Sequence, residues 1–155
     1  MNTLLEKAQE KTTGEIEFAT FYVGGQLLGV DIRQAQEINR QLDETPAPQA
    51  PDYVRGVVNL RGEVVTVLDL GMILIGQPTA VTANSRNFIV QIDGEQIGLL
   101  VDRVADVVKA SVAQIEPPPA NIGDSEHHYY KGVYKLPHEI LTILDIYQII
   151  NVLTE

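Results

Sequence analysis

Short apolar segments alternate with glycine- or proline-containing breaks along the first 70 residues, a pattern typical of small β proteins. The first apolar segment, 15–23, is rich in β-branched and aromatic residues, and Gly24 and Gly25 separate it from a second segment at 26–32. Two glycines between apolar runs predict a β-hairpin. Apolar side chains then recur at helical spacing, which predicts a short helix over about 33–41.

A proline-rich segment separates these elements from a second predicted hairpin. Pro46, Pro48 and Pro51 lie within six residues. Proline lacks the amide N–H that helices and inner strands need, so this segment is expected to be an extended loop. Strands are then predicted at 56–60 and 63–68, with the turn at Arg61 and Gly62.

The same order of elements occurs twice along the chain. With an offset of 69, FYVGGQLLGVDI at 21–32 falls on VQIDGEQIGLLV at 90–101. With an offset of 76, 56–70 falls on 132–146, and 7 of 15 positions are identical. The second linker is therefore 76 − 69 = 7 residues longer, and it also contains a proline run. The duplication predicts two similar small β-barrels related by a pseudo-twofold axis.

The repeat also predicts the domain organisation. Residues 1–14 are expected to be a flexible leader, and 15–155 one domain of two interlocked barrel subdomains, approximately 15–80 and 81–155. A unit of about 60 residues has only a marginal core by itself. Its strands are apolar at nearly every position, which predicts that both faces are covered. The C-terminal segment, 146–153, is expected to pack back as a short closing helix.

Composition and charge exclude several classes of function. The 155 residues include 11 Lys and Arg against 21 Asp and Glu, a net charge of −10, so neither nucleic acid nor an anionic membrane surface is an expected partner. The chain has no Cys, which excludes disulfides and thiol chemistry. No apolar window approaches the 20 or so residues that span a bilayer. A cytoplasmic protein without direct membrane insertion is predicted.

No group of residues predicts catalysis, a cofactor or a metal site. Asp69 and Asp145 are the best carboxylate pair, but they occupy equivalent positions in the two copies. A duplicated residue favours a structural role, such as capping the turn after each strand. His127 and His128 are adjacent and have no third ligand at suitable spacing, which favours a solvated loop over a metal site. An acidic-site hydrolase is the alternative, and it would need a single asymmetric pocket.

The two copies differ most at the tip of the second hairpin. Asn59-Leu60-Arg61-Gly62-Glu63 in the first copy corresponds to Lys135-Leu136-Pro137-His138-Glu139 in the second. Only the first copy places an arginine beside a glycine at the tip. An exposed guanidinium is suited to binding a carboxylate through two hydrogen bonds. Arg61 is therefore a candidate contact residue, with an ordinary solvated turn arginine as the alternative.

These segments resemble a known family. VRGVVNLRGEVVTVLDL at 54–70 resembles the signature of the CheW family, the scaffold proteins of bacterial chemotaxis. Three further segments are similar to it: GVDIRQAQEI at 29–38, GLLVDRVADVV at 98–108 and ILTILDIYQII at 140–150. The resemblance covers about 16–150. Thr66 and Gly71 depart from it, because the family often has Pro at the first position and a basic residue at the second.

The resemblance implies a mainly β fold of two pseudo-symmetric five-stranded barrels of the Src-homology-3 type with short helices. It implies a non-enzymatic adaptor, without a cofactor, that joins the cytoplasmic tip of chemoreceptors to the regulatory domain of the histidine kinase CheA. An adaptor for a CheA-like kinase in a non-motility chemosensory pathway is the alternative. A monomer is expected in dilute solution, assembling with its partners in membrane receptor arrays.

The resemblance and the pseudo-twofold together imply a groove that faces the receptor. Its expected residues are Ala35, Glu37, Ile38, Arg61, Val104 and Val107. In this hypothesis Arg61 and Glu37 anchor the receptor contact, while Ala35 and Ile38 correspond to Val104 and Val107 in the second copy. The alternative is that the four apolar residues belong to the core. Three further residues are assigned to the turn and its motif: Gly56, Asn59 and Gly62.

Overall fold

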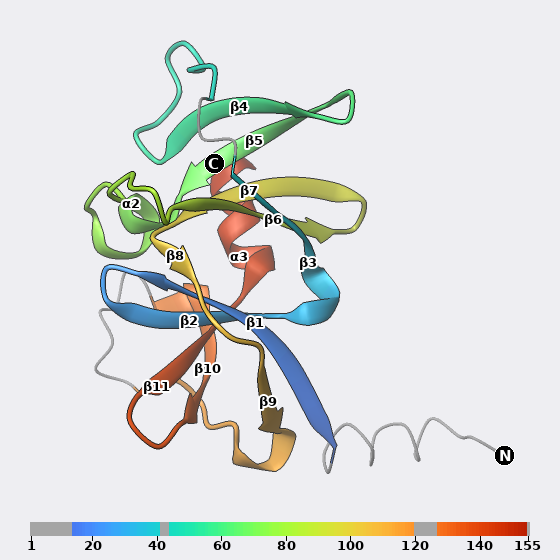
Figure 1. Ribbon diagram of the computed structural model, residues 1–155, viewed down its shortest axis with the longest axis vertical. Helices are drawn as coiled ribbons and strands as arrows, with labels where there is room; N and C mark the ends of the chain where they lie inside the picture. The colour runs from blue at the N-terminus through green and yellow to red at the C-terminus, as the bar shows by residue number, and fades with distance from the viewer. Residues whose placement is uncertain (1–13, 41–43, 120–126, 155) are drawn as a thin grey trace, which may run out of the picture.

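The computed structural model describes residues 14–40, 44–119 and 127–154, so the expected leader lies almost wholly outside the described residues (Figure 1). The elements are β1 (Glu15–Val23), β2 (Gln26–Asp31), η1 (Ile32–Gln34), β3 (Ala35–Asn39), β4 (Val54–Leu60), β5 (Glu63–Asp69), α2 (Leu70–Ile75), β6 (Arg86–Ile92), β7 (Glu95–Val101), β8 (Arg103–Val104), β9 (Val108–Ser111), η2 (Val112–Gln114), η3 (His127–Tyr129), β10 (Tyr130–Lys135), β11 (Ile140–Leu144), α3 (Ile146–Ile150) and η4 (Asn151–Thr154). Both predicted hairpins of the first copy, β1–β2 and β4–β5, are confirmed.

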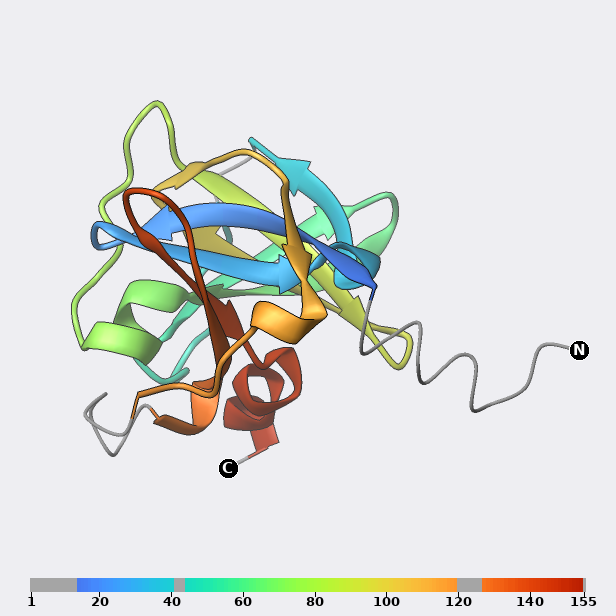
Figure 2. The ribbon, with the colours of Figure 1, turned by 90° about the horizontal axis from the view of Figure 1, so that it is seen from below.

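The strands form two sheets, and each sheet takes strands from both copies (Figures 1 and 2). Sheet A has the order β10-β11-β2-β1-β8, with β9 also paired to β1, and sheet B has the order β3-β6-β7-β5-β4. In sheet A, β8 pairs with one end of β1 and β9 with the other. The two short strands therefore fill one strand position, so the two sheets have equivalent plans. The mainly β, pseudo-symmetric fold is confirmed.

The pairing register repeats between the sheets. The parallel pairing of β5 with β7 places Val67 opposite Gly98, and that of β11 with β2 places Ile143 opposite Gly29. These partners are related by the offsets 76 and 69 that were read from the sequence. A β-bulge also interrupts each second hairpin at the equivalent place, beside Gly56 in one copy and beside Gly132 in the other. The repeat in the sequence is thus a repeat of backbone geometry.

The sheets do not follow the boundary expected near residue 80. The β1–β2 hairpin of the first copy lies in sheet A beside β11, while the β6–β7 hairpin of the second copy lies in sheet B beside β5. Each sheet therefore combines the first hairpin of one copy with the remaining strands of the other. This exchange of hairpins interlocks the halves 15–80 and 81–155, and within the described residues neither half forms a sheet of its own.

The helix predicted at 33–41 is wrong. Ile32–Gln34 form a 3₁₀ turn, and Ala35–Asn39 form β3, which pairs with β6 at the edge of sheet B. The Asp31 carboxylate accepts hydrogen bonds from the Arg33 backbone N–H and side chain, and this bond caps the turn. The chain passes here from sheet A to sheet B, and the pairing with β6 outweighs the local helical spacing because tertiary contacts override propensity.

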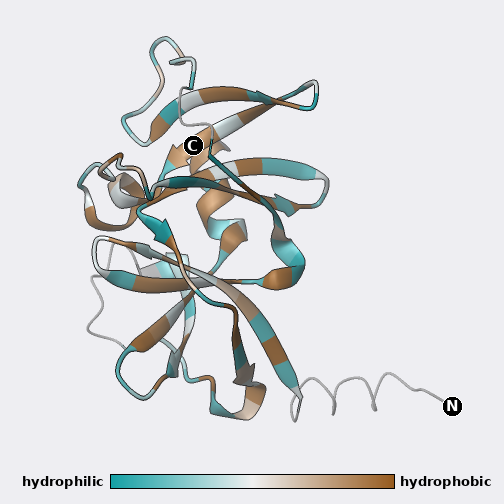
Figure 3. Ribbon diagram, viewed as in Figure 1, coloured by the Kyte–Doolittle hydropathy of each residue, from teal (hydrophilic) through white to brown (hydrophobic). Residues whose placement is uncertain are grey.

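The shared core lies between the two sheets, and Figure 3 shows apolar residues on α3 and on the strands around it. Phe21 from sheet A and Phe88 from sheet B meet there with ring centroids 5.0 Å apart. The opposite face of each sheet buries a cluster of its own, because neighbouring strand residues point to opposite faces. Leu68, for example, faces the shared core, whereas Val67 faces the cluster of sheet B. The expectation that the strands are covered on both faces is confirmed.

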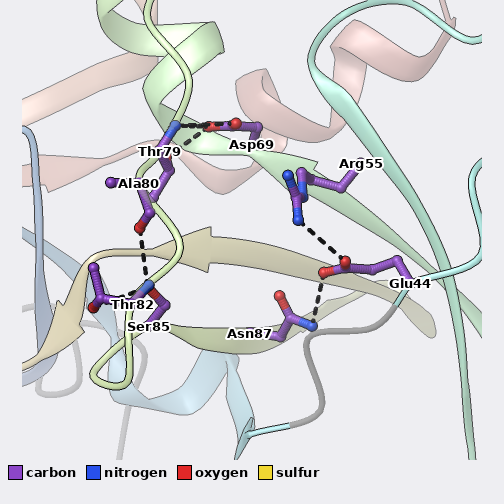
Figure 4. A network of polar contacts seen from close by, with 8 residues as sticks. All are labelled: Glu44, Arg55, Asp69, Thr79, Ala80, Thr82, Ser85 and Asn87. Carbon is purple, nitrogen blue, oxygen red and sulfur yellow. Dashed lines mark hydrogen bonds and ion pairs between the residues drawn. The ribbon is translucent and has the colours of Figure 1, made fainter.

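A buried ionic group holds the first proline-rich linker in place (Figure 4). The Glu44 carboxylate accepts hydrogen bonds from Arg55 on β4 and from Asn87 on β6, both at 3.4 Å. Thr45 then exchanges two backbone hydrogen bonds of 2.9 Å with Val57. The linker therefore covers the outer edge of β4, which protects an otherwise open strand edge.

Candidate protein-binding face

Five of the six expected groove residues lie on or just after the edge strands of the two sheets, and Arg61 contacts one of these five, Glu37. β3 is the edge strand of sheet B, and β8 is the edge strand of sheet A. Figure 2 shows β3 and the chain that follows β8 on the side of the molecule opposite α3. The pseudo-twofold thus brings equivalent edges of the two sheets to a common surface, which we call the edge face.

The structure divides the four apolar groove residues into two pairs. Ala35 and Val104, which are equivalent in the two copies, are half-buried and pack against the shared core. Ile38 and Val107, also equivalent, have 50% and 52% of their surface exposed. The alternative interpretation, in which these apolar residues belong to the core, therefore applies to Ala35 and Val104. The second pair places two large apolar side chains in solvent on the edge face.

Glu37 and Arg61 form an ion pair at the edge strand that carries Ile38. Arg61 Nη2 lies 3.4 Å from Glu37 Oε2, which joins β3 to the tip of the β4–β5 hairpin. β3 and β4 lie at opposite ends of sheet B, so the contact shows that the sheet curls until its two ends are close. The Arg61 side chain is 78% exposed. An exposed pair of this kind contributes only about 0.2–1 kcal/mol to stability, and most Arg61 donors are left for a partner.

Arg61 occupies an unfavourable backbone conformation. Its φ is 53° and that of Gly62 is 85°, so both turn residues are in the left-handed region, as in type I′ hairpin turns. Asn59 Oδ1 accepts a hydrogen bond of 3.0 Å from the Gly62 N–H and supports the turn. The turns of the first hairpins also have two residues with positive φ, which are Gly24 and Gly25 in one copy and Asp93 and Gly94 in the other. Glycine and aspartate tolerate positive φ better than arginine does. Such strain is typical of functional positions.

Gly56 has a separate structural role below the tip. Its φ is 147°, and a Cβ atom there would overlap the backbone carbonyl of Thr45. Glycine is therefore required where the linker crosses the bulge in β4. The three turn and motif residues, Gly56, Asn59 and Gly62, shape the hairpin that carries Arg61.

One charged residue on sheet A was missed by the sequence analysis. Arg103 on β8 precedes Val104, and its guanidinium carbon lies 4.0 Å from the centre of the Tyr22 ring. The Tyr22 hydroxyl donates to both oxygens of the Glu139 carboxylate, at 2.9 and 3.0 Å, and this hydrogen bond raises the pKa of Tyr22. Arg103 and Tyr22 are 81 residues apart and meet only through the pairing of β1 with β8. No local sequence signal marks this contact.

The duplicated carboxylates are helix caps, as predicted. Asp69 Oδ1 accepts from the Met72 N–H at 3.2 Å and Asp145 Oδ1 from the Gln148 N–H at 3.4 Å. Gly71, one of the two departures from the family pattern, is buried, and a Cβ atom there would overlap the Gln77 carbonyl oxygen. The loop after α2 therefore fills the space that a side chain at position 71 would need.

Comparisons with known proteins agree with this geometry. Residues 17–153 match the family model described as a CheW-like domain. The chemotaxis protein CheW of Rhizobium meliloti (strain 1021) is 32% identical over 139 residues, 90% of each chain. Protein FrzA of Myxococcus xanthus is 34% identical over 119 residues, 77% of this chain and 74% of the relative. The crystal structure of the scaffolding protein TtCheW from Thermoanaerobacter tengcongensis superposes with a TM-score of 0.77 and 28% identity, covering 84% of this chain and 88% of that one.

Proposed function

This chain belongs to the CheW family, and from that premise we propose that it couples chemoreceptors to the histidine kinase CheA in bacterial chemotaxis. The observation that carries the proposal is the edge face, where Ile38 and Val107 are exposed at equivalent positions and Arg61 pairs with Glu37, the neighbour of Ile38 on β3. The tip of a chemoreceptor is a helical hairpin, and an amphipathic helix binds by laying an apolar stripe on such a surface. The two apolar side chains receive that stripe, and Arg61 binds a carboxylate next to it.

The kinase contact is proposed at a different place, the second hairpin of the second copy (β10–β11), which has Pro137 and His138 where the first copy has Arg61 and Gly62. Val64 is 70% exposed and its equivalent Ile140 is 52% exposed. The regulatory domain of CheA is expected to pack barrel to barrel against such a tip. A receptor and a kinase bound to separate surfaces are then held in a fixed relative position. Coupling of this kind makes and breaks no covalent bond, so neither a catalytic residue nor a cofactor is required.

Association with membranes is proposed to be indirect. No helix in the described ranges is long and apolar enough to cross a membrane. The protein is expected in the cytoplasm, held at receptor arrays through its partners. Pairwise binding is expected to be transient and to be strengthened by the many neighbouring sites in an array.

Co-sedimentation with receptor-containing membranes and CheA tests the proposal. The protein should increase the amount of kinase that sediments with the membranes. Arg61→Ala should sediment less with receptors while it still binds the kinase in solution. Ile140→Ser is the matched variant at the other surface. If kinase recruitment is the same with and without the protein, the coupling role is wrong.

A further inference from the structure

The two halves of the chain complete each other's sheets. Many of the strand pairings join one half to the other. They are β1 with β8, β1 with β9, β2 with β11, β3 with β6, and β5 with β7. Pairings within a half are limited, among the described strands, to the four hairpins. Most of the contacts that hold the fold together are thus contacts between the halves. The corresponding half of a second molecule carries the same contact surface.

A single loop, residues 76–85, connects the halves. Most of it is exposed, but internal hydrogen bonds hold it compact. Ser85 is fully buried, and its hydroxyl donates to the Ala80 carbonyl at 3.0 Å and accepts from the Thr82 N–H at 2.8 Å (Figure 4). The loop is therefore folded back on itself and not stretched between α2 and β6.

One buried contact fastens this loop to the first half. Asp69 accepts hydrogen bonds from the Thr79 hydroxyl at 2.6 Å and from the Thr79 N–H at 3.1 Å, and the Thr79 hydroxyl accepts from the Gly71 N–H at 3.1 Å. Both Asp69 and Thr79 are buried. We call this contact the Asp69–Thr79 clasp. Hydrogen bonds to a buried carboxylate are among the stronger ones, and breaking them leaves an unpaired charge.

We propose that a second copy of this chain replaces one half with its own, giving a dimer in which each two-sheet body is built from two chains. Only the loop changes conformation, because every contact between halves is reproduced between chains. Ten residues, 76–85, span roughly 33–36 Å when extended, which suffices to join two bodies that meet at this loop. The Asp69–Thr79 clasp holds the chain in the closed, monomeric form.

The dimer has a consequence for binding. Ile38 and Arg61 belong to the first half, and Val104 and Val107 to the second, so each body of the dimer presents a complete edge face made by two chains. A dimer of this kind carries two edge faces joined by two copies of the loop. Two linked faces bind a multivalent target more tightly than two separate molecules. This inference does not depend on the identity of that target.

The pseudo-twofold supplies a matched control. Asp145 caps α3 as Asp69 caps α2, but its described side-chain hydrogen bond is to Gln148 only. Asparagine keeps an acceptor oxygen for the cap at either position. Asp69→Asn therefore weakens the clasp and removes its charge, whereas Asp145→Asn changes a cap residue alone. Thr79→Val removes the hydroxyl of the clasp and leaves the Asp69 cap on Met72 in place.

A disulfide reports which chains are paired. Glu17 on β1 and Lys109 on β9 are exposed cross-strand partners from different halves, and the chain has no native Cys. In a Glu17→Cys, Lys109→Cys background, oxidation links a monomer to itself but links the two chains of an exchanged dimer. In this background, the protein with the natural loop and the variants Asp69→Asn, Thr79→Val and Asp145→Asn are refolded from denaturant over a range of protein concentrations. Light scattering then gives the mass of each fraction, and non-reducing electrophoresis gives the linkage.

We expect a chain-linked dimer whose fraction rises with refolding concentration. Its fraction in Asp69→Asn and Thr79→Val should be at least threefold that in Asp145→Asn. Equal fractions in these variants would overturn the role of the clasp. Dimers linked only within each chain, or no dimer of the wild-type loop at any concentration, would overturn the exchange itself. If Asp69→Asn does not fold, Thr79→Val and the wild-type concentration series decide.

Discussion

Ile38 and Val107 are 69 residues apart in the sequence and are exposed to nearly the same extent on the edge face, at equivalent positions of the two copies. The residues three positions earlier in each copy, Ala35 and Val104, are half-buried and pack against the shared core. Both copies therefore retain one half-buried and one exposed apolar residue at this edge. A duplicated exposure of this kind is what the proposed receptor contact requires, because that contact uses both copies together.

Serine at Ile38 or at Val107 should weaken receptor binding without unfolding the protein. Losing about 1 kcal/mol of apolar contact lowers the affinity roughly fivefold, whereas exposed substitutions change stability by less than about 0.5 kcal/mol. Binding to a receptor-tip fragment is measured by calorimetry and stability by urea denaturation. Ile75→Ser, which changes an exposed apolar residue at the end of α2, is the control. If all three variants lose the same affinity, the edge face is not the receptor-binding surface.

Asparagine at Arg61 should stabilise the fold and weaken receptor binding. The left-handed conformation is less costly for Asn than for Arg, so the free energy of unfolding is expected to rise by about 0.5–1 kcal/mol. The Glu37 pair, which is exposed, offsets little of this gain. Asp93→Asn at the equivalent position of the β6–β7 turn should change neither property. A drop in the stability of Arg61→Asn would show that the arginine holds the hairpin and that the strain argument is wrong.

Acid should remove a stabilising contact at Asp31. The Arg33 side chain, hydrogen-bonded to this carboxylate, lowers the pKa of Asp31 below its ordinary value of 3.8. A lowered pKa in the folded state means that the contribution to stability is present above pH 3.8 and is lost as the pH falls below it. Urea denaturation at pH 7 and near pH 3 should therefore show a smaller loss of stability in Arg33→Gln than in the wild type. The same acid loss in both would contradict the assignment.

Alanine at Gly29 should destabilise the parallel junction of β2 with β11. A Cβ atom at Gly29 would lie 2.9 Å from Leu141 Cδ1, inside a packed interior. Overpacking of this kind costs about 1–3 kcal/mol. Leu141→Val removes part of the obstacle, so the double variant should lose less stability than the sum of the two single variants. Strict additivity in chemical denaturation would mean that Gly29 and Leu141 do not interfere.

The local elements of this fold could be predicted from the sequence, and the pairing between halves could not. Gly24 with Gly25 and the alternating apolar runs identify hairpins because a hairpin is a local structure. The position of β3 depends on β6, about 50 residues later, so helical spacing at Ala35 and Ile38 was misleading. The groove residues expected from the sequence stay a prediction, and their division into half-buried and exposed pairs follows from how each edge strand lies on the core. Arg103 was missed for the same reason, since its contact with Tyr22 exists only in the folded sheet.

The exchange of hairpins also constrains how the chain acquires its structure during synthesis. When the first half leaves the ribosome, β1 and β2 can pair only with each other and β3 has no strand partner, because the other strands they pair with are not yet made. Long-range pairings form slowly, and unpaired strand edges favour aggregation while they wait. The nascent first half is therefore the vulnerable species. Chaperone dependence should be highest before β6 and β7 emerge and should fall once β11 has closed sheet A.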